Sequence, residues 1–363
     1  MKITVSKKEL SGALGIVTKA ITGKSTMPVL EGVLLKAENG TLTLVGSDLN
    51  ISIITNISTI SLDEEGSLVV DAKMFSDIVR KMATDDIVLS TKDTKLNIKS
   101  GRTKLDVVFL DSKDYPKLPT LDVVSTYSIE DNALKDMVKT TAFAIAQDET
   151  RPILTGELFE IKDNVMTLVG LDGYRMATRK ILLTATDCSI VIPGKTLLEV
   201  EKIIGNEEVP VKVSVNDKNV WFEYKDIKVI SRLMEGNYVK YSSLFPVEYK
   251  TIVTVKRKEF LDMMDRIAVV KDATNLVKLS IKDNVIVATG KSGLGDIEDE
   301  MDCVCNGDGL EIAFNNKYLT EALKCLNVDD VDFNFVTNIS PCKVTSKEDD
   351  NFAQLVLPVR LVK

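Results

Sequence analysis

Hydrophobic and polar residues alternate along the chain with two different periods, which predict helices and strands. Apolar residues spaced three and four apart, typical of amphipathic helices, occur in residues 3–20, 127–145 and 253–270, each of which begins as a strand. A further helix is predicted in each of residues 71–82, 193–204 and 315–326. Runs rich in Val, Ile, Leu and Thr predict short strands between the helices, and four more strands are expected after each second helix. The pattern therefore predicts an α+β fold.

The predicted elements recur because the chain contains a long repeat. Residues 27–48, MPVLEGVLLKAENGTLTLVGSD, return 124 positions later as RPILTGELFEIKDNVMTLVGLD, with nine identities over the 21 positions from residue 28 to residue 48. A third copy is visible at residues 281–290, where IKDNVIVATG matches IKDNVMTLVG. A repeat unit of this length is a domain rather than a solenoid turn. Proline-containing joins predict three repeated domains, residues 1–122, 123–247 and 248–363.

Composition excludes several kinds of chemistry. The chain has no histidine, which excludes Ser-His-Asp and Cys-His catalysis and His-ligated metal sites. It has no Walker-type nucleotide motif, and its five cysteines without a C-x-x-C pair are typical of reduced thiols in a cytoplasmic protein. The chain has no run of 18 apolar residues, so a membrane span is not expected. Acidic runs such as residues 298–302 are interpreted as solvated loop charges, so no metal or other cofactor is expected.

Positive charges recur at matching positions on the second predicted helix of each repeat. Lys73, Lys195 and Lys317 stand 122 positions apart, and Arg80, Lys202 and Lys324 each follow seven residues later. Positions seven apart lie on one stripe of a helix. One interpretation is an ordinary solvated face, and the other is a surface that faces phosphates. The net charge of −8 favours weak contact without sequence preference over tight binding.

Several motifs carry a family resemblance that extends from one end of the chain to the other. They are MKITVSKKEL, STMPVLEGVLL, GSDLNISI, TRPILTG, LVGLDGYRMA, AFNNKYL and LVLPVRL. With these motifs the chain resembles the bacterial sliding clamps, the beta subunits of DNA polymerase III. The resemblance implies a head-to-tail homodimer that closes a ring of six domains around double-stranded DNA, with helices lining the hole and antiparallel sheets outside. It also implies a non-catalytic processivity factor whose partners are the polymerase III catalytic subunit, the clamp loader and other proteins with a clamp-binding motif.

The size of such a ring agrees with a dimer. Twelve helices spaced by ~10 Å give a circle about 38 Å across at the helix axes. Removing about 5 Å of helix radius on each side leaves roughly 28 Å, which admits a duplex of about 20 Å and a layer of water. Six helices from a single chain would leave only about 9 Å by the same arithmetic.

The resemblance also assigns roles to individual residues. It places DNA contacts at Lys24, Lys73 and Lys195, and the repeated stripe adds Arg80, Lys202 and Lys324. A loop that carries glutamine and aromatic residues in some clamps has Asp148, Pro152 and Ile153 here, which weakens a DNA-binding role for that loop. The ring seam would join Leu105 and Val107 of one chain with Val269 and Val270 of the other, through pairing of edge strands.

A pocket for partner peptides is implied by a further set of residues. Apolar side chains with a few polar neighbours suit a short linear peptide with Leu or Phe anchors. The set is Leu154, Leu171, Gly173, Tyr174, Arg175, Met176, Val239, Ser243, Leu244, Asn315, Tyr318, Leu355, Leu357, Pro358, Val359, Arg360 and Leu361. Tyr174 and Val239 stand where clamps often have histidine and proline, and the chain continues two residues beyond the usual Arg-Leu end.

Two other functions are compatible with parts of the sequence. A metal-dependent phosphoesterase could use Asp48 and Asp172, although their recurrence at the same strand-turn position fits turn chemistry better than one active site. A scaffold ring that does not touch DNA would leave the repeated basic stripe without a role.

Overall fold

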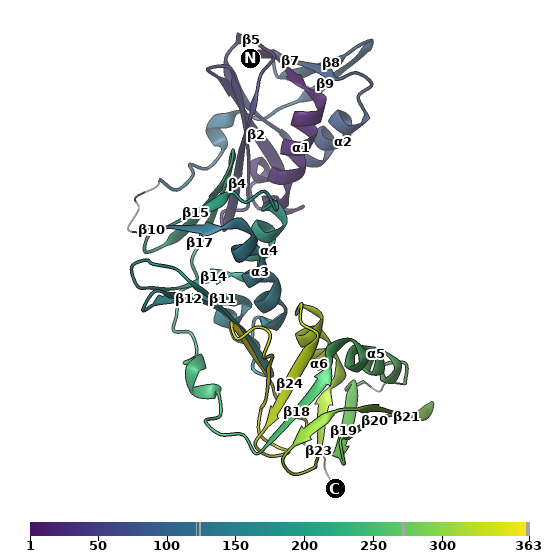
Figure 1. Ribbon diagram of the computed structural model, residues 1–363. Coiled ribbons are helices and arrows are strands. Elements are labelled where there is room, and N and C mark those ends of the chain that lie inside the picture. The colour runs from purple at the N-terminus through teal and green to yellow at the C-terminus, as the bar shows by residue number, and fades with distance from the viewer. Residues whose placement is uncertain (121, 123–124, 271–272, 361–363) are drawn as a thin grey trace. The chain divides into compact units, whose positions relative to one another are not determined.

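The computed structural model describes residues 1–120, 122, 125–270 and 273–360, and it confirms the α+β class (Figure 1). Within these residues the chain contains six α-helices, all of them in the segments where the apolar spacing predicted a helix. They are α1 (Lys7–Val17), α2 (Ala72–Lys81), α3 (Asp131–Thr141), α4 (Gly194–Ile203), α5 (Arg257–Ile267) and α6 (Asn316–Lys324). Side-chain caps start two of them: Asp71 accepts a hydrogen bond from the Met74 amide, and Asn315 accepts one from the Lys317 amide.

The chain divides into two compact units. The first contains residues 1–132 and 199–233, and the second contains residues 133–198 and the described residues from 234 onward. The central repeat therefore contributes strands to both units. The division into domains 1–122, 123–247 and 248–363 stays a prediction about the repeat.

The first unit contains the strands of the first repeat and half of those of the second. Its strands are β1 (Lys2–Ser6), β2 (Gly32–Glu38), β3 (Thr41–Ser47), β4 (Ile51–Ser58), β5 (Ser61–Glu64), β6 (Gly66–Asp71), β7 (Asp86–Lys92), β8 (Lys95–Ser100), β9 (Thr103–Val108), β10 (Ser125–Glu130), β15 (Pro210–Val215), β16 (Asn219–Tyr224) and β17 (Ile227–Arg232). They form antiparallel sheets with the orders β5-β1-β7-β8-β9 and β10-β15-β16-β17-β4-β3-β2-β6.

The second unit has the same construction. Its strands are β11 (Gly156–Lys162), β12 (Val165–Leu171), β13 (Arg175–Leu182), β14 (Cys188–Pro193), β18 (Thr251–Lys256), β19 (Leu276–Lys282), β20 (Val285–Ser292), β21 (Gly295–Asp302), β22 (Val304–Asn306), β23 (Leu310–Asn315), β24 (Asp330–Phe335), β25 (Cys342–Thr345) and β26 (Phe352–Val356). They form sheets with the orders β14-β11-β12-β13-β26-β25-β24-β18-β22 and β21-β20-β19-β23.

The prediction of four strands after each second helix was wrong. Three strands follow it in each repeat, for example β7, β8 and β9 after α2. The residues after β9 make only the isolated bridge between Leu110 and Val69 and then a short 3₁₀ turn at Ser112–Asp114. Pro116 and Pro119 follow, and proline cannot donate to a ladder of strand hydrogen bonds, so the segment continues as a linker.

Consecutive repeats join through strand pairing of one kind. The last strand of the second repeat, β17, pairs antiparallel with the fourth strand of the first, β4. The last strand of the third repeat, β26, pairs in the same way with the fourth strand of the second, β13. The last strand of the first repeat, β9, and the fourth strand of the third repeat, β21, do not take part in such a joint. Each is an edge strand in the described part of the chain.

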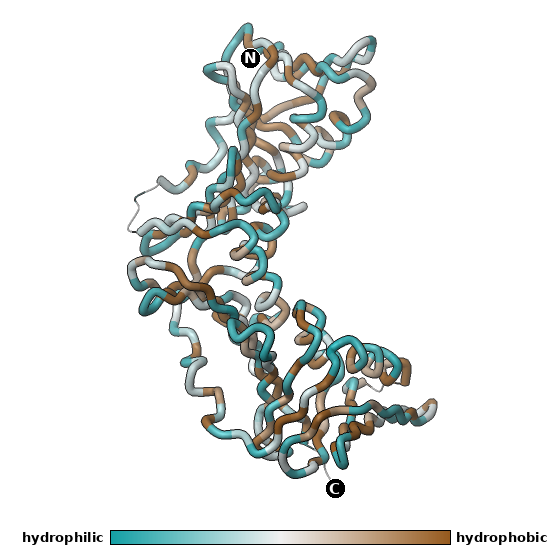
Figure 2. The backbone as a smooth tube through the Cα atoms, viewed as in Figure 1, coloured by the Kyte–Doolittle hydropathy of each residue, from teal (hydrophilic) through white to brown (hydrophobic). Residues whose placement is uncertain are grey.

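Helices cover one face of the sheets and enclose an apolar core. α1 packs against α2 and β4, and α5 packs against α6, β20 and β21 (Figure 1). Figure 2 shows hydrophobic stretches along the strands and hydrophilic residues at many of the hairpin turns. The repeated glycines follow from this packing: a Cβ atom at Gly46 would lie 2.1 Å from the Val17 carbonyl oxygen, and one at Gly170 would lie 2.5 Å from that of Thr141.

The segments between β9 and β10 and between β17 and β18, here called the first and second linkers, dock on their sheets through equivalent tyrosines, which the sequence analysis did not identify. The Tyr115 hydroxyl donates to the Val45 carbonyl at 3.5 Å, and the Tyr238 hydroxyl donates to the Val169 carbonyl at 3.1 Å. The two carbonyls are 124 positions apart, and burial raises the pKa of both phenols, so they remain neutral donors. The second linker thereby lies over the sheet that carries the expected peptide pocket.

Candidate functional site

The repeated basic stripe is exposed on all three second helices. Arg80, Lys202 and Lys324 expose 68%, 53% and 57% of their side chains, respectively. Lys73, Lys195 and Lys317 are exposed as well. Exposure confirms that each helix presents its two cations together, and it is compatible with either interpretation of the stripe.

Carboxylates partner these cations at close range. Asp77 forms an ion pair with Arg80, and Lys202 Nζ lies 2.8 Å from Glu199 Oε1. Lys324 Nζ lies 3.5 Å from an oxygen of Asp265 on α5, and Lys317 Nζ lies 3.8 Å from Glu321 Oε1. Asp77, Glu199 and Glu321 are themselves 122 positions apart. The repeat therefore includes a carboxylate between the two cations of each helix, which the sequence analysis did not identify.

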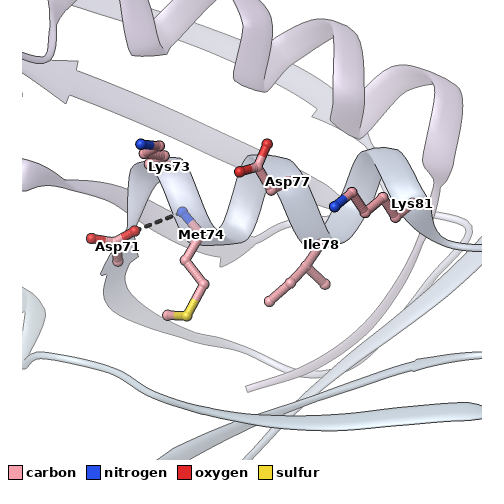
Figure 3. A pocket seen from close by; sticks show the side chains of 6 residues that line it. All are labelled: Asp71, Lys73, Met74, Asp77, Ile78 and Lys81. Carbon is pink, nitrogen blue, oxygen red and sulfur yellow. Dashed lines mark hydrogen bonds between the residues drawn. The ribbon is translucent and has the colours of Figure 1, made fainter.

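Figure 3 shows how α2 arranges these groups. Lys73 and Asp77 point to one side of the helix, whereas Met74 and Ile78 point to the other (Figure 3). All four line a shallow groove along α2. The apolar face expected beside the stripe is therefore only partly buried, since Met74 exposes 43% of its surface. Ala72, Phe75 and Val79 are the residues of α2 that reach the core.

The other residues expected to contact DNA lie in loops. Lys24 is exposed in the segment that connects the 3₁₀ turn at Thr18–Ala20 to β2. Asp148 accepts a hydrogen bond from the Thr150 amide at 2.9 Å, and the hydrogen bond of the Thr150 side chain, together with this one, lowers the pKa of Asp148. Pro152 begins a short 3₁₀ helix, and Ile153 packs partly buried against the apolar cluster described next.

The apolar residues expected in the peptide pocket form one cluster. Leu154, Leu171, Met176 and Leu355 are buried side by side with Leu158, Val169 and Val191. Met176 and Leu355 are register partners across the β13–β26 joint. Tyr238, Tyr241 and Phe245 of the second linker pack against the same cluster. Val239, Ser243 and Leu244 lie in this linker, and Val239 and Leu244 are exposed beside its half-buried aromatic residues.

Arg175 is the polar centre of this region. Its side chain is 6% exposed, and its Nε lies 3.0 Å from Asp172 Oδ2. Its Nη1 donates to Glu321, and its Nη2 donates to the Phe143 carbonyl at 2.6 Å. The guanidinium lies 4.6 Å from the centre of the Tyr318 ring and 5.2 Å from that of Phe143. Arg175 therefore connects the β12–β13 turn, α6 and the segment after α3 within one unit.

Exposed side chains surround this centre. Tyr174, which is 62% exposed, stacks on Tyr318 with ring centres 6.1 Å apart. Burial raises the pKa of Tyr318, and the negative charge of Asp172 adds to the effect. Gly173 has a φ of +93°, a conformation that favours glycine in the turn before Tyr174. Asn315 directly precedes α6, and its side chain caps the N-terminal end of that helix.

The C-terminal tail completes the region. The Leu357 amide donates to the Tyr174 carbonyl at 2.9 Å, and the Val359 amide donates to the Ala313 carbonyl at 2.8 Å. Leu357 and Val359 are each more than a third exposed, Pro358 is half-buried and Arg360 is exposed. Leu361 lies outside the described residues. The structure thus brings most of the expected pocket residues together on one face of the second unit.

The seam residues divide into exposed and buried ones. Leu105 on β9 is exposed, Val269 after α5 is 81% exposed, and Val270 is half-buried. Val107 is only 4% exposed because its side chain belongs to the core beneath β9. The Val107 side chain is thus buried in the single chain, whereas Leu105 and Val108 are apolar side chains that β9 exposes, and the seam stays a prediction.

Family comparisons match the whole length of the chain. Models of the DNA polymerase III beta subunit match its N-terminal domain at residues 1–119, its central domain at 128–240 and its C-terminal domain at 242–360. The chain belongs to the DNA polymerase III beta-subunit family, the bacterial sliding clamps. As a member of that family it is a non-catalytic processivity subunit.

Relatives in the clamp family agree over the full length. A beta sliding clamp of Staphylococcus aureus is 32% identical, with 99% of each chain covered. The solved DNA polymerase sliding clamp of Bacillus subtilis has a TM-score of 0.95 at 31% identity and covers 100% of both chains. The Thermotoga maritima DNA polymerase III beta subunit has a TM-score of 0.93 at 27% identity, covering 99% of this chain and 100% of its own.

The acidic residues considered for a phosphoesterase have structural roles in this clamp-family fold. Asp48 accepts hydrogen bonds from the Asn50 and Ile51 amides, and Asp172 accepts them from the Tyr174 and Arg175 amides. The two carboxylates therefore hold the same turn in two repeats, as turn chemistry predicts. The described residues contain no group of three or more Cys, Asp or Glu side chains arranged to hold a metal. None of their helices is long and apolar enough to cross a membrane.

Proposed function

We propose that this chain forms a head-to-tail homodimeric ring of six domains, three per chain over residues 1–122, 123–247 and 248–363. The ring encircles duplex DNA in the cytoplasm and tethers the DNA polymerase III catalytic subunit to it. The clamp loader and other proteins with a clamp-binding motif use the same peptide pocket. Lys24, Lys73 and Lys195 contact phosphates, together with Arg80, Lys202 and Lys324.

The pattern of strand joints carries the ring proposal. Within the chain, a last strand of one repeat pairs with a fourth strand of another at β17–β4 and at β26–β13. The unused last strand, β9, and the unused fourth strand, β21, are both edge strands of antiparallel sheets. Pairing β9 with β21 of a second copy would repeat the same joint and satisfy both free edges. A heterologous contact of this kind closes into a ring when its rotation allows.

Charge supports this pairing. Lys95, Lys99 and Lys104 are exposed on one face of the β8–β9 pair, where Lys99 and Lys104 are direct register partners. On β21, Asp296, Glu298, Glu300 and Asp302 alternate along the exposed face. Figure 2 shows β21 as a largely hydrophilic strand. Opposite charges facing each other across a joint favour the heterologous pair over pairing of two identical edges.

We expect charged residues at the seam to give monomers. Val269→Glu combined with Val270→Glu would bury two carboxylates without partners at a contact that is apolar in the natural protein, so the copies no longer associate. Sedimentation velocity measures the mass. Val247→Glu, at a site that is 96% exposed, is the matched control and retains the dimer. A dimer mass for the double variant would contradict the proposed seam.

Topological retention on DNA tests the function itself. We expect protein loaded onto nicked circular DNA by a clamp loader to stay bound, and to be released when the circle is cut. A ring holds DNA by enclosure, so an acidic chain with a net charge of −8 needs little affinity for phosphate. Gel filtration before and after linearisation measures retention. Equal retention on the linear product would show that affinity holds the protein, against the proposal.

A further inference from the structure

Each second helix carries a carboxylate between its two repeated cations. We propose that Asp77, Glu199 and Glu321, here called the inner carboxylates, act as built-in counterions that weaken the hold of each helix on DNA phosphates. This inference rests on the proposed function, because it concerns the same surface. Its consequence is a clamp whose basic helices attract DNA without gripping it.

The spacing makes the effect local. In each helix the carboxylate lies four residues after the first cation and three before the second, so all three groups share one stripe. Figure 3 shows Lys73 and Asp77 pointing to the same side of α2. Asp77 forms an ion pair with Arg80, Glu199 with Lys202, and Glu321 with Lys317. A phosphate approaching the stripe therefore competes with a carboxylate that already holds a cation.

Folding contributes to the placement of Glu199, which is 15% exposed and also pairs with Lys19, and of Glu321, which also pairs with Arg175, but it does not explain Asp77. Asp77 and Arg80 expose 44% and 68% of their side chains, and exposed ion pairs contribute little to stability. The core of each helix is formed by other residues, such as Phe75 and Val79 in α2. A solvated helix needs no carboxylate at one fixed position in three repeats. A surface that must stay weakly attractive to a polyanion does need one beside each cation.

The test uses the full-length protein with Asp77→Asn and Glu199→Gln together. Glu321 is kept because it also accepts a hydrogen bond from Arg175 in the pocket. The probe is a short blunt-ended duplex, which cannot trap a ring, titrated by fluorescence anisotropy at several salt concentrations. We expect binding at least about threefold tighter at low salt, and a log–log salt dependence steeper by about 1, because freed cations gain phosphate contacts.

Control variants separate position from total charge. Glu38→Gln with Glu311→Gln removes the same two charges from strands, where these carboxylates pair with Lys36 and Lys278. Equal tightening in this control overturns the inference, because net charge alone would then explain the effect. Asp77→Asn alone provides a milder version if the double variant folds poorly.

A third variant separates this inference from the proposed function. Lys73→Gln with Lys195→Gln is expected to weaken binding to the same duplex. If it does so while the inner-carboxylate variant binds as the natural protein does, the helices contact DNA and only the counterion role is lost. If neither variant changes binding, the second helices do not contact DNA, and both proposals fail.

Discussion

Glu157→Val is expected to raise the free energy of unfolding by about 3–5 kcal/mol at pH 8. The Glu157 side chain on β11 is fully buried, and burial raises its pKa to about 8, although a hydrogen bond from Thr141 opposes the shift. The Thr141 hydroxyl lies 2.5 Å from Glu157 Oε2, whereas Oε1 accepts no hydrogen bond from the described residues. A buried carboxyl with an unpartnered oxygen is costly, most of all when it is ionised.

The repeat supplies the replacement residue. The positions that match Glu157 in the first and third repeats are Val33 and Val277, and both are fully buried. Valine therefore fits this site in the same fold. Thr141 keeps a partner after the change, because its hydroxyl also lies 2.7 Å from the Met137 carbonyl. The substitution removes a buried acid without leaving another buried polar group unsatisfied.

The pH dependence identifies the cause. The folded state binds the Glu157 proton more tightly than the unfolded state, whose pKa is near 4.5, so stability falls as pH rises from about 4.5 to about 8. The slope of this contribution approaches about 1.4 kcal/mol per pH unit. The chain has no histidine, so no imidazole titrates in this range.

Urea denaturation between pH 5 and 8.5 measures both effects. Glu157→Val should be more stable and should lose this slope, whereas Glu311→Gln, which changes an exposed glutamate, should keep the natural slope. An unchanged slope in Glu157→Val would mean that the carboxyl ionises without cost in the folded protein.

Arg175→Ala is expected to destabilise the second unit by about 3 kcal/mol and to abolish peptide binding. The change leaves Asp172 and Glu321 without their shared cation and removes the hydrogen bond to the Phe143 carbonyl. Asp172 is itself mostly buried, so its charge is not fully compensated by water. The Tyr318 ring also loses the guanidinium that packs on it.

Tyr174→Ala separates the two consequences. Tyr174 is mostly exposed and contacts Tyr318 only by stacking, so its loss should cost less than about 1 kcal/mol of stability. It should still weaken binding of a labelled peptide with Leu and Phe anchors by about tenfold, because an exposed aromatic wall is typical of a binding hot spot. Thermal unfolding and fluorescence anisotropy measure the two quantities. Full peptide affinity in both variants would show that the peptide binds elsewhere.

Local pattern predicted the helices well and the sheets less well. Apolar spacing located all six helices, because each buries one face against its own sheet. The sheets depend on pairs such as Ile51 with Ser231, which no local pattern reveals. For the same reason the sequence did not indicate that the central repeat is shared between two units. The extra strand expected after β9 failed because apolar residues such as Leu110 belong to a docked linker.

The repeat contained more information on the site than was first read from it. The cations were found by their spacing, and the same comparison would have found the inner carboxylates and Tyr115 with Tyr238. It would also have marked Glu157 as the one acid at a position that is otherwise valine. The arrangement around Arg175 could not be found in this way, because Asp172, Tyr318 and Phe143 meet only after the unit folds.

The strand joints have a consequence for synthesis on the ribosome. Arg175 on β13 pairs with Val356 on β26, so this sheet is incomplete until residue 356 has been made. In the first unit, likewise, one edge of β4 stays unpaired until β17 has been made. Such distant pairing slows folding, and each waiting edge is open to pairing with another nascent chain. Loss of residues 352–356, which form β26, would leave this edge of β13 permanently unpaired, so chains without them should aggregate rather than accumulate as shortened clamps.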